Sequence, residues 1–145
     1  MRVDLSPLAT ASLAIDVHLA TVLPAFALGS YLIFFSTKGA PHHRALGYLY
    51  LTLMTITAIT TLFIHEVNPR GPMGFSLIHL FVPLTLFGVV GAISGARTHN
   101  IKRHRNAMIG LYVGGLLIAG ALTFLPGRVM HRIFFPTTEI SAPAR

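Results

Sequence analysis

The chain has 145 residues, of which 53% are hydrophobic and only 10% are charged, whereas about a quarter of an average soluble domain is charged. This composition excludes an ordinary water-soluble domain, because too few charged residues are present to cover a helical core. The net charge of +7 does not indicate a nucleic-acid partner, since the basic residues flank apolar stretches, where anionic lipid surfaces attract them.

Four stretches of the chain contain no Asp, Glu, Lys, Arg or His, and each approaches the roughly 20 residues that a helix needs to cross a bilayer. Backbone groups in lipid must be satisfied within the segment, so each stretch should be helical. We predict an all-α, four-transmembrane-helix bundle that forms one integral membrane domain over residues 1–145. The expected helices are approximately 13–37, 44–65, 76–96 and 104–126.

The first predicted helix resembles a signal peptide in one respect, because Ala25-Phe26-Ala27 has the small residues of a processing site. Asp16 and His18 would interrupt the apolar core that a signal peptide requires. We therefore expect the segment to be retained as a helix, with Pro24 producing a bend.

The second predicted helix carries a polar stripe. At 100° per residue, the members of this stripe lie near one line along the helix and should face the bundle interior. The stripe consists of His43, Gly47, Tyr50, Met54, Thr57, Thr61 and His65. The corresponding line on the fourth helix is apolar after its first residue and consists of His104, Met108, Leu111, Gly115, Ile118 and Leu122.

Small residues predict close packing of the third and fourth helices, because they allow two backbones to approach each other. They are Gly88, Ala92 and Ala96 on the third helix, and Gly110, Gly114, Gly115, Ala119 and Gly120 on the fourth. An equally open interpretation is that one of these faces docks onto another membrane subunit.

Histidines recur at matching places along the chain. Two pairs, each with its members 25 residues apart, are related by a constant offset of 61 residues: His18 with His43, and His79 with His104. This spacing predicts two tandem helical hairpins, residues 12–65 and 73–126, arranged as a parallel repeat. A pseudo-twofold axis would bring the first histidines of the two pairs together near one membrane face and the second histidines near the other.

The two short loops carry basic residues and no acid, which predicts that they are cytoplasmic. Their basic residues are Lys38, Arg44, Arg97, Lys102, Arg103 and Arg105. All four acids of the chain fall on the opposite side. We therefore expect a multi-pass protein of the bacterial inner membrane with both termini outside.

Facing imidazoles near a membrane surface suggest ligation of a b-type haem by His18 and His79, with His43 and His104 as a second pair. An ionisable side chain inside a membrane is costly and by default marks a site. The absence of cysteine removes thiolate ligands and covalent haem attachment. His42, His99 and His131 lie in loops or the tail, where we expect them to anchor the chain at the lipid surface.

A metal site is the alternative at the outer end of the bundle. His65 and Glu66, at the end of the second helix, would join His18 and His79 around Zn²⁺, Cu²⁺ or non-haem iron. The residues would come from separate helices, without a local metal-binding motif. A chain that binds no cofactor is also open.

Several runs at the helix ends are similar to those of a bacterial family of four-helix predicted membrane proteins classed as a domain of unknown function. These runs are His43-Arg44-Ala45-Leu46-Gly47, Ser76-Leu77-Ile78-His79, His104-Arg105-Asn106-Ala107-Met108 and Leu125-Pro126-Gly127-Arg128. The resemblance covers roughly residues 10–135 and implies a fold but no activity. The paired histidines alone give a more distant likeness to cytochromes of the b561 type.

Three functions therefore compete. The first is a redox or metal-binding membrane protein that uses the paired histidines for electron transfer. The second is an accessory subunit that docks on a larger membrane complex through a small-residue face. The third is a small protein that provides a path for protons or a solute. No nucleophile–base set or phosphate-binding loop supports a hydrolase or a kinase.

Overall fold

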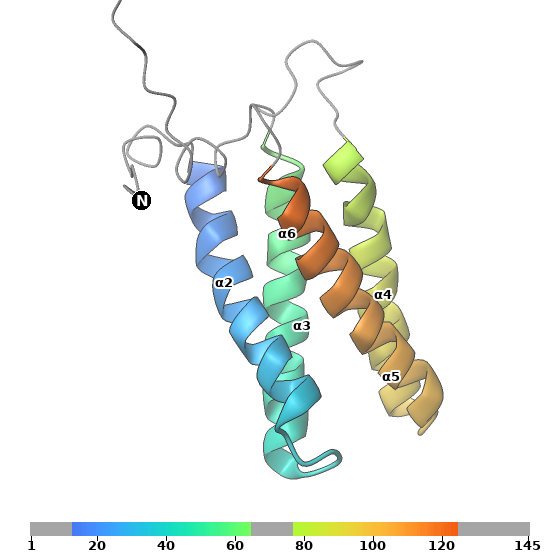
Figure 1. Ribbon diagram of the computed structural model, residues 1–145. Helices are drawn as coiled ribbons and strands as arrows, with labels where there is room; N and C mark the ends of the chain where they lie inside the picture. The colour runs from blue at the N-terminus through green and yellow to red at the C-terminus, as the bar shows by residue number, and fades with distance from the viewer. Residues whose placement is uncertain (1–12, 65–76, 125–145) are drawn as a thin grey trace, which may run out of the picture.

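A computed structural model describes residues 13–64 and 77–124, and within these ranges the chain is all-helical, with four helices and no strand (Figure 1). The prediction of an all-α fold with four helices is thus confirmed for the described residues. In chain order the elements are α2 (Leu13–Phe34), α3 (Pro41–Thr61), η2 (Leu77–Leu80), α4 (Phe81–Arg97), α5 (Ile101–Gly110), η3 (Leu111–Ile118) and α6 (Ala119–Leu122). The short 3₁₀ helix η2 leads directly into α4, and the last three elements form one continuous helix.

The helices pack as two neighbouring hairpins. In the first hairpin α2 contacts α3; in the second α4 contacts α5 and η3; and α3 joins the hairpins by packing on α4. Both short turns lie at the same end of the molecule (Figure 1). Whether the hairpins are copies of one repeat stays a prediction; His18 lies inside α2, whereas His79 lies in the 3₁₀ turn η2.

The turn between α2 and α3 is fixed by a lysine. The Nζ of Lys38 donates hydrogen bonds to the carbonyls of Leu32, Ile33 and Ser36 at 2.9, 2.9 and 3.0 Å. These bonds satisfy carbonyls that the end of a helix leaves without partners. The chain then turns at Gly39, whose φ of +83° suits a residue without a Cβ. Helix α3 begins at Pro41, ahead of the residue 44 expected from the uncharged stretch.

The turn between α4 and α5 ends in an N-cap. The side chain of Asn100 accepts a hydrogen bond from the backbone N–H of Arg103 at 2.9 Å, which is a preferred way to begin a helix. Helix α5 therefore starts at Ile101, ahead of the residue 104 expected from charge alone. Basic residues end an apolar stretch but do not end a helix, which explains the difference.

Glycines bring α4 close to the fourth helix, as the small residues predict. A Cβ on Gly88 would lie 2.8 Å from the Leu111 side chain, and one on Gly95 would lie 2.5 Å from the backbone nitrogen of His104. Two glycines of the fourth helix also face α4: a Cβ on Gly115 would lie 3.3 Å from the Thr85 hydroxyl, and one on Gly114 would lie 3.8 Å from the Leu84 side chain. A Cβ on Gly110 or Gly120 would meet no other described residue within 4 Å.

Tyr112 of η3 ties the two hairpins together near the middle of the bundle. Its hydroxyl forms a hydrogen bond of 2.7 Å with Ser30 on α2, and its ring stacks on Phe26 with centroids 5.8 Å apart. The absence of a Cβ on Gly29 makes room for this ring, since a Cβ there would lie 2.9 Å from Cδ2 of Tyr112.

We expect Tyr112→Phe to lower the stability of the detergent-solubilised protein by about 1 kcal/mol, because it removes the interhelical hydrogen bond and keeps the ring. Thermal unfolding followed by circular dichroism measures the change. Tyr48→Phe is the matched control, since Tyr48 is 56% exposed. Equal stability losses in the two variants would show that the Ser30 bond contributes nothing.

The outside of the bundle is apolar. Phe87 is 77% exposed, and Leu80 and Phe34 are exposed to a similar degree, whereas large exposed apolar patches are rare on soluble monomers. Helices Leu13–Phe34 and Ile101–Leu122 are each long and apolar enough to cross a membrane. Buried positions, by contrast, include polar residues such as Ser36, Thr57 and Thr85.

The polar stripe of α3 faces inward where it crosses the middle of the bundle, because Tyr50, Met54 and Thr57 are all buried. Only some residues of the line predicted on the fourth helix are buried. Leu111 is buried, but Ile118 is 49% exposed and Leu116 is buried in its place. The cause is η3, a π-helical segment whose wider turns shift the register relative to an α-helix.

Candidate functional site: an apolar cavity beside His18

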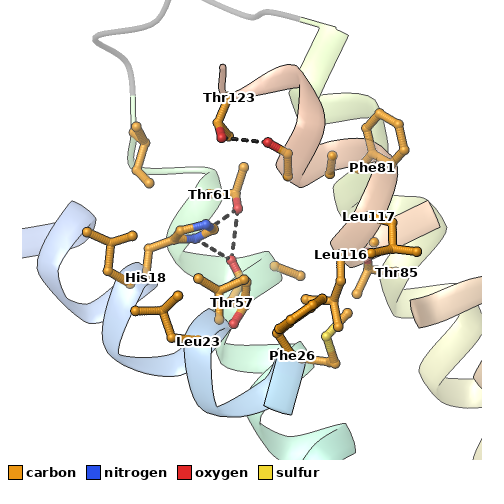
Figure 2. A pocket seen from close by; sticks show the side chains of 18 of the residues that line it. His18, Leu23, Phe26, Thr57, Thr61, Phe81, Thr85, Leu116, Leu117 and Thr123 are labelled. Atoms are coloured by element: carbon orange, nitrogen blue, oxygen red, sulfur yellow. Dashed lines mark hydrogen bonds between the residues drawn. The ribbon is translucent and has the colours of Figure 1, made fainter. Parts of the chain in front are cut away.

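A cavity of about 600 Å³ lies between the two hairpins, and its lining includes residues of α2, α3, α4, η3 and α6. This volume is typical of sites that hold a cofactor or another small molecule. The cavity lies toward the end of the bundle where α2 begins and α6 ends (Figure 1). Its walls are mostly apolar, and the five polar side chains in its lining are His18, Thr57, Thr61, Thr85 and Thr123 (Figure 2).

His18 is held in place by the end of α3. Its Nδ1 lies 3.2 Å from the Thr57 carbonyl, 3.2 Å from the Thr60 hydroxyl and 3.3 Å from the Thr61 hydroxyl. Figure 2 shows the imidazole beside Thr57 and Thr61 at the edge of the cavity. The hydroxyl of Thr57 in turn donates to the hydroxyl of Thr21, on α2, at 2.9 Å.

These contacts fix the tautomer of the imidazole. A carbonyl oxygen accepts hydrogen bonds but donates none, so the bond to Thr57 places the hydrogen of His18 on Nδ1. The Thr61 hydroxyl donates its own hydrogen to the Thr57 carbonyl at 2.8 Å and thus accepts at His18. The lone pair of the ring is therefore on Nε2. An Nδ1–H anchored by a carbonyl is how proteins orient metal-ligating histidines.

His79 does not share this cavity. It is buried, at 7% exposure, in η2, and it is not among the residues that line the cavity. The facing of His18 and His79 thus stays a prediction. Of the alternative metal site, His65 and Glu66 lie outside the described residues; within residues 13–64 and 77–124, no group of three or more His, Cys, Asp or Glu is placed to hold a metal ion.

His43 and His104 lie at the other end of the bundle. The Nδ1 of His43 is 3.0 Å from the hydroxyl of Ser36, and the Nδ1–H of His104 donates to the Ala92 carbonyl at 2.9 Å. His43 lies in the first turn of α3, before the uncharged stretch that begins after Arg44. Burial lowers its pKa, and Lys38, His104 and His42 lower it further by repulsion. His43 and His104 are thus near enough to interact, although their role as cofactor ligands stays a prediction.

The remaining histidines lie apart from the cavity. His42 and His99 are exposed, which is compatible with contact to the membrane surface, and His99 adopts a φ of +54° in the turn before α5. His131 lies outside the described residues.

The sequence did not reveal the residues that hold His18. The segment Thr55-Ile56-Thr57-Ala58-Ile59-Thr60-Thr61 is rich in threonine, and this richness was the available signal. In the polar stripe Thr57 and Thr61 stood out, but Thr60 did not. The π-helical shift that places Leu116 and Leu117 in the cavity lining has no comparable signal in the hydrophobic pattern.

Comparison with known families matches residues 15–141 to the family described as "Predicted membrane protein (DUF2306)". The chain belongs to this family. The resemblance drawn from the helix-end runs is thereby confirmed, and as a membrane protein of the DUF2306 family the chain contacts the lipid bilayer. Neither the curated proteins nor the solved structures give a significant match.

Membership in the DUF2306 family agrees with the apolar outside of the bundle, because exposed side chains such as Phe87 and Leu80 then meet lipid rather than water. The family description assigns no activity. The likeness to cytochromes of the b561 type stays a prediction.

Proposed function

We propose that this membrane protein binds a b-type haem in the cavity between its hairpins, with Nε2 of His18 as the axial ligand, and that it serves in electron transfer. The observation that carries the proposal is an imidazole in the lining of an apolar cavity of about 600 Å³ whose Nδ1–H is committed to the Thr57 carbonyl. A neutral imidazole with an available Nε2 is a good ligand for haem iron.

The character of the cavity supports a hydrophobic ligand. Phe26, Phe81 and Leu116 are among its apolar lining residues, and ligand sites are typically apolar with a few placed polar groups. Helix α2 packs mainly on α3, with few contacts to the second hairpin. A molecule dissolved in the bilayer can therefore enter between the hairpins. The protein would act as a multi-pass protein of the bacterial inner membrane, with both termini outside.

One consequence distinguishes this proposal from ligation by two histidines. His18 lines the cavity and His79 does not, so we expect one histidine ligand and an open coordination position. Such a haem is high-spin and binds carbon monoxide, whereas ligation by two histidines blocks the carbon monoxide site.

The test is a visible absorption spectrum of the detergent-purified protein, recorded oxidised, then reduced with dithionite, then under carbon monoxide, together with elemental analysis. We expect about one iron per chain and a reduced spectrum that shifts when carbon monoxide is added. A colourless protein without metal, after expression with added haem precursor, would contradict the proposal.

An accessory subunit is a second candidate, because Gly110 and Gly120 have open space beside them among the described residues. Small residues on an outward face allow another helix to approach closely. In that case the protein would copurify in constant ratio with a second membrane protein. A path for protons or a solute, the third candidate, has the threonines near His18 in its favour.

A further inference from the structure

The end of the bundle opposite the cavity gathers basic side chains without an acid among the described residues. Arg44 lies in the first turn of α3, and the first turns of α5 hold Lys102, Arg103 and Arg105, all of them exposed. These four residues are called the basic end below. The one acid within residues 13–64 and 77–124 is Asp16, in the first turn of α2 at the other end (Figure 1).

The arrangement is electrostatically unfavourable for the protein alone. The two helices both begin at this end, and the first turn of neither contains an acid. A helix N-terminus carries a positive partial charge, so cations in the first turn are repelled and acids are normally preferred there. The four cations of the basic end thus lack an opposite charge from the described part of the protein, and an anion from outside would remove this repulsion.

Both hairpins contribute basic side chains to this end of the bundle. The beginnings of α3 and α5 lie at the same end of the bundle (Figure 1), and the charge of His104 lowers the pKa of His43 across the two hairpins. Lys38 already donates to two carbonyls at the end of α2 and to that of Ser36 in the turn after it. The arginines of the basic end, by contrast, are exposed, and a guanidinium can bind two phosphate oxygens at once.

We propose that the basic end binds the phosphate group of an anionic phospholipid and so bridges the two hairpins at the membrane surface. Apolar side chains adjoin the cations directly: Ile101 is 74% exposed beside Lys102, and Tyr48 and Leu49 are exposed one turn along α3 from Arg44. These side chains offer a surface for the acyl chains next to the phosphate. This neighbouring apolar surface favours a lipid over a soluble phosphate.

The test is native mass spectrometry of the full chain, released from micelles that contain phosphatidylglycerol or phosphatidylcholine. We expect the wild type to retain phosphatidylglycerol preferentially. Arg44→Gln/Arg105→Gln should weaken that retention by about 30-fold, or roughly fivefold for each arginine. The single variant Arg105→Gln is compared with the control Arg97→Gln, because each removes one charge and Arg97 lies at the last turn of α4, where a helix favours a cation.

Equal retention of the two lipids by the wild type would overturn the proposal, as would an equal loss in Arg97→Gln and Arg105→Gln. Millimolar inorganic phosphate is added in a parallel series. Displacement of the lipid at that concentration would assign the basic end to a soluble anion instead. Circular dichroism of each variant shows that the helices are retained, and Arg44→Lys/Arg105→Lys, which keeps the charge, should recover most of the binding.

Discussion

Replacing Gly95 by alanine will lower the thermal midpoint of the detergent-solubilised protein by about 6 °C. The added Cβ would lie 2.5 Å from the backbone nitrogen of His104 and 2.9 Å from its Cα. Backbone atoms cannot rotate away as a side chain does, so α4 and α5 must separate. Overpacking of this kind costs about 3 kcal/mol, of which roughly 1 kcal/mol is offset by the better helix propensity of alanine.

The separation would also stretch the hydrogen bond from His104 to the Ala92 carbonyl, which is 2.9 Å long. Circular dichroism at increasing temperature measures the midpoint. Gly110→Ala is the control and should raise the thermal midpoint slightly. A Cβ there meets no described residue within 4 Å, so only the better helix propensity of alanine remains. A midpoint for Gly95→Ala at or above that of the wild type would show that α4 and α5 are not packed so closely.

Replacing His18 by alanine will abolish haem binding under the proposed function. The substitution removes the imidazole from the cavity lining, and no other described histidine lines the cavity. The threonines that hold His18 keep hydrogen bonds to carbonyls of their own helix, from Thr60 to Ile56 and from Thr61 to Thr57. We therefore expect the fold to persist while the ratio of haem to protein falls from near one to near zero.

His79→Ala is the matched control for this measurement, because His79 is buried at the same end of the bundle but outside the cavity lining. It should leave the haem content and the carbon monoxide difference spectrum unchanged. Loss of haem in both variants would instead indicate ligation by His18 and His79 together. Pyridine haemochrome spectra measure the haem content independently of its ligands.

The sequence predicted those features that depend on solvent and on local size. Uncharged stretches located the four helices, and Gly88 predicted the close approach of α4 to the fourth helix; Gly95, where the approach is tightest, was not among the predicted residues. Both features follow from short-range rules, since lipid requires helices and small residues allow contact. The inward face of α3 followed from the same helical period, with Tyr50 and Met54 buried as expected.

The candidate site was less predictable because it depends on tertiary contacts. His18 stood out as an ionisable residue in an apolar segment, but its partners Thr57, Thr60 and Thr61 come from another helix about 40 residues away. The hydrogen bond between Ser36 and His43 also depends on how the turn folds. A periodic pattern identifies the face of a helix and leaves open which neighbour meets it.

The π-helical segment η3 has a consequence for the whole fourth helix. Met108, before this segment, is buried; within the segment Leu116 is buried while Ile118 turns outward. One added residue in a turn corresponds to a rotation of about 100°. The fourth helix is therefore two α-helical pieces joined out of phase. The first closes the bundle against α4, and the second is rotated so that the cavity beside His18 has a wall.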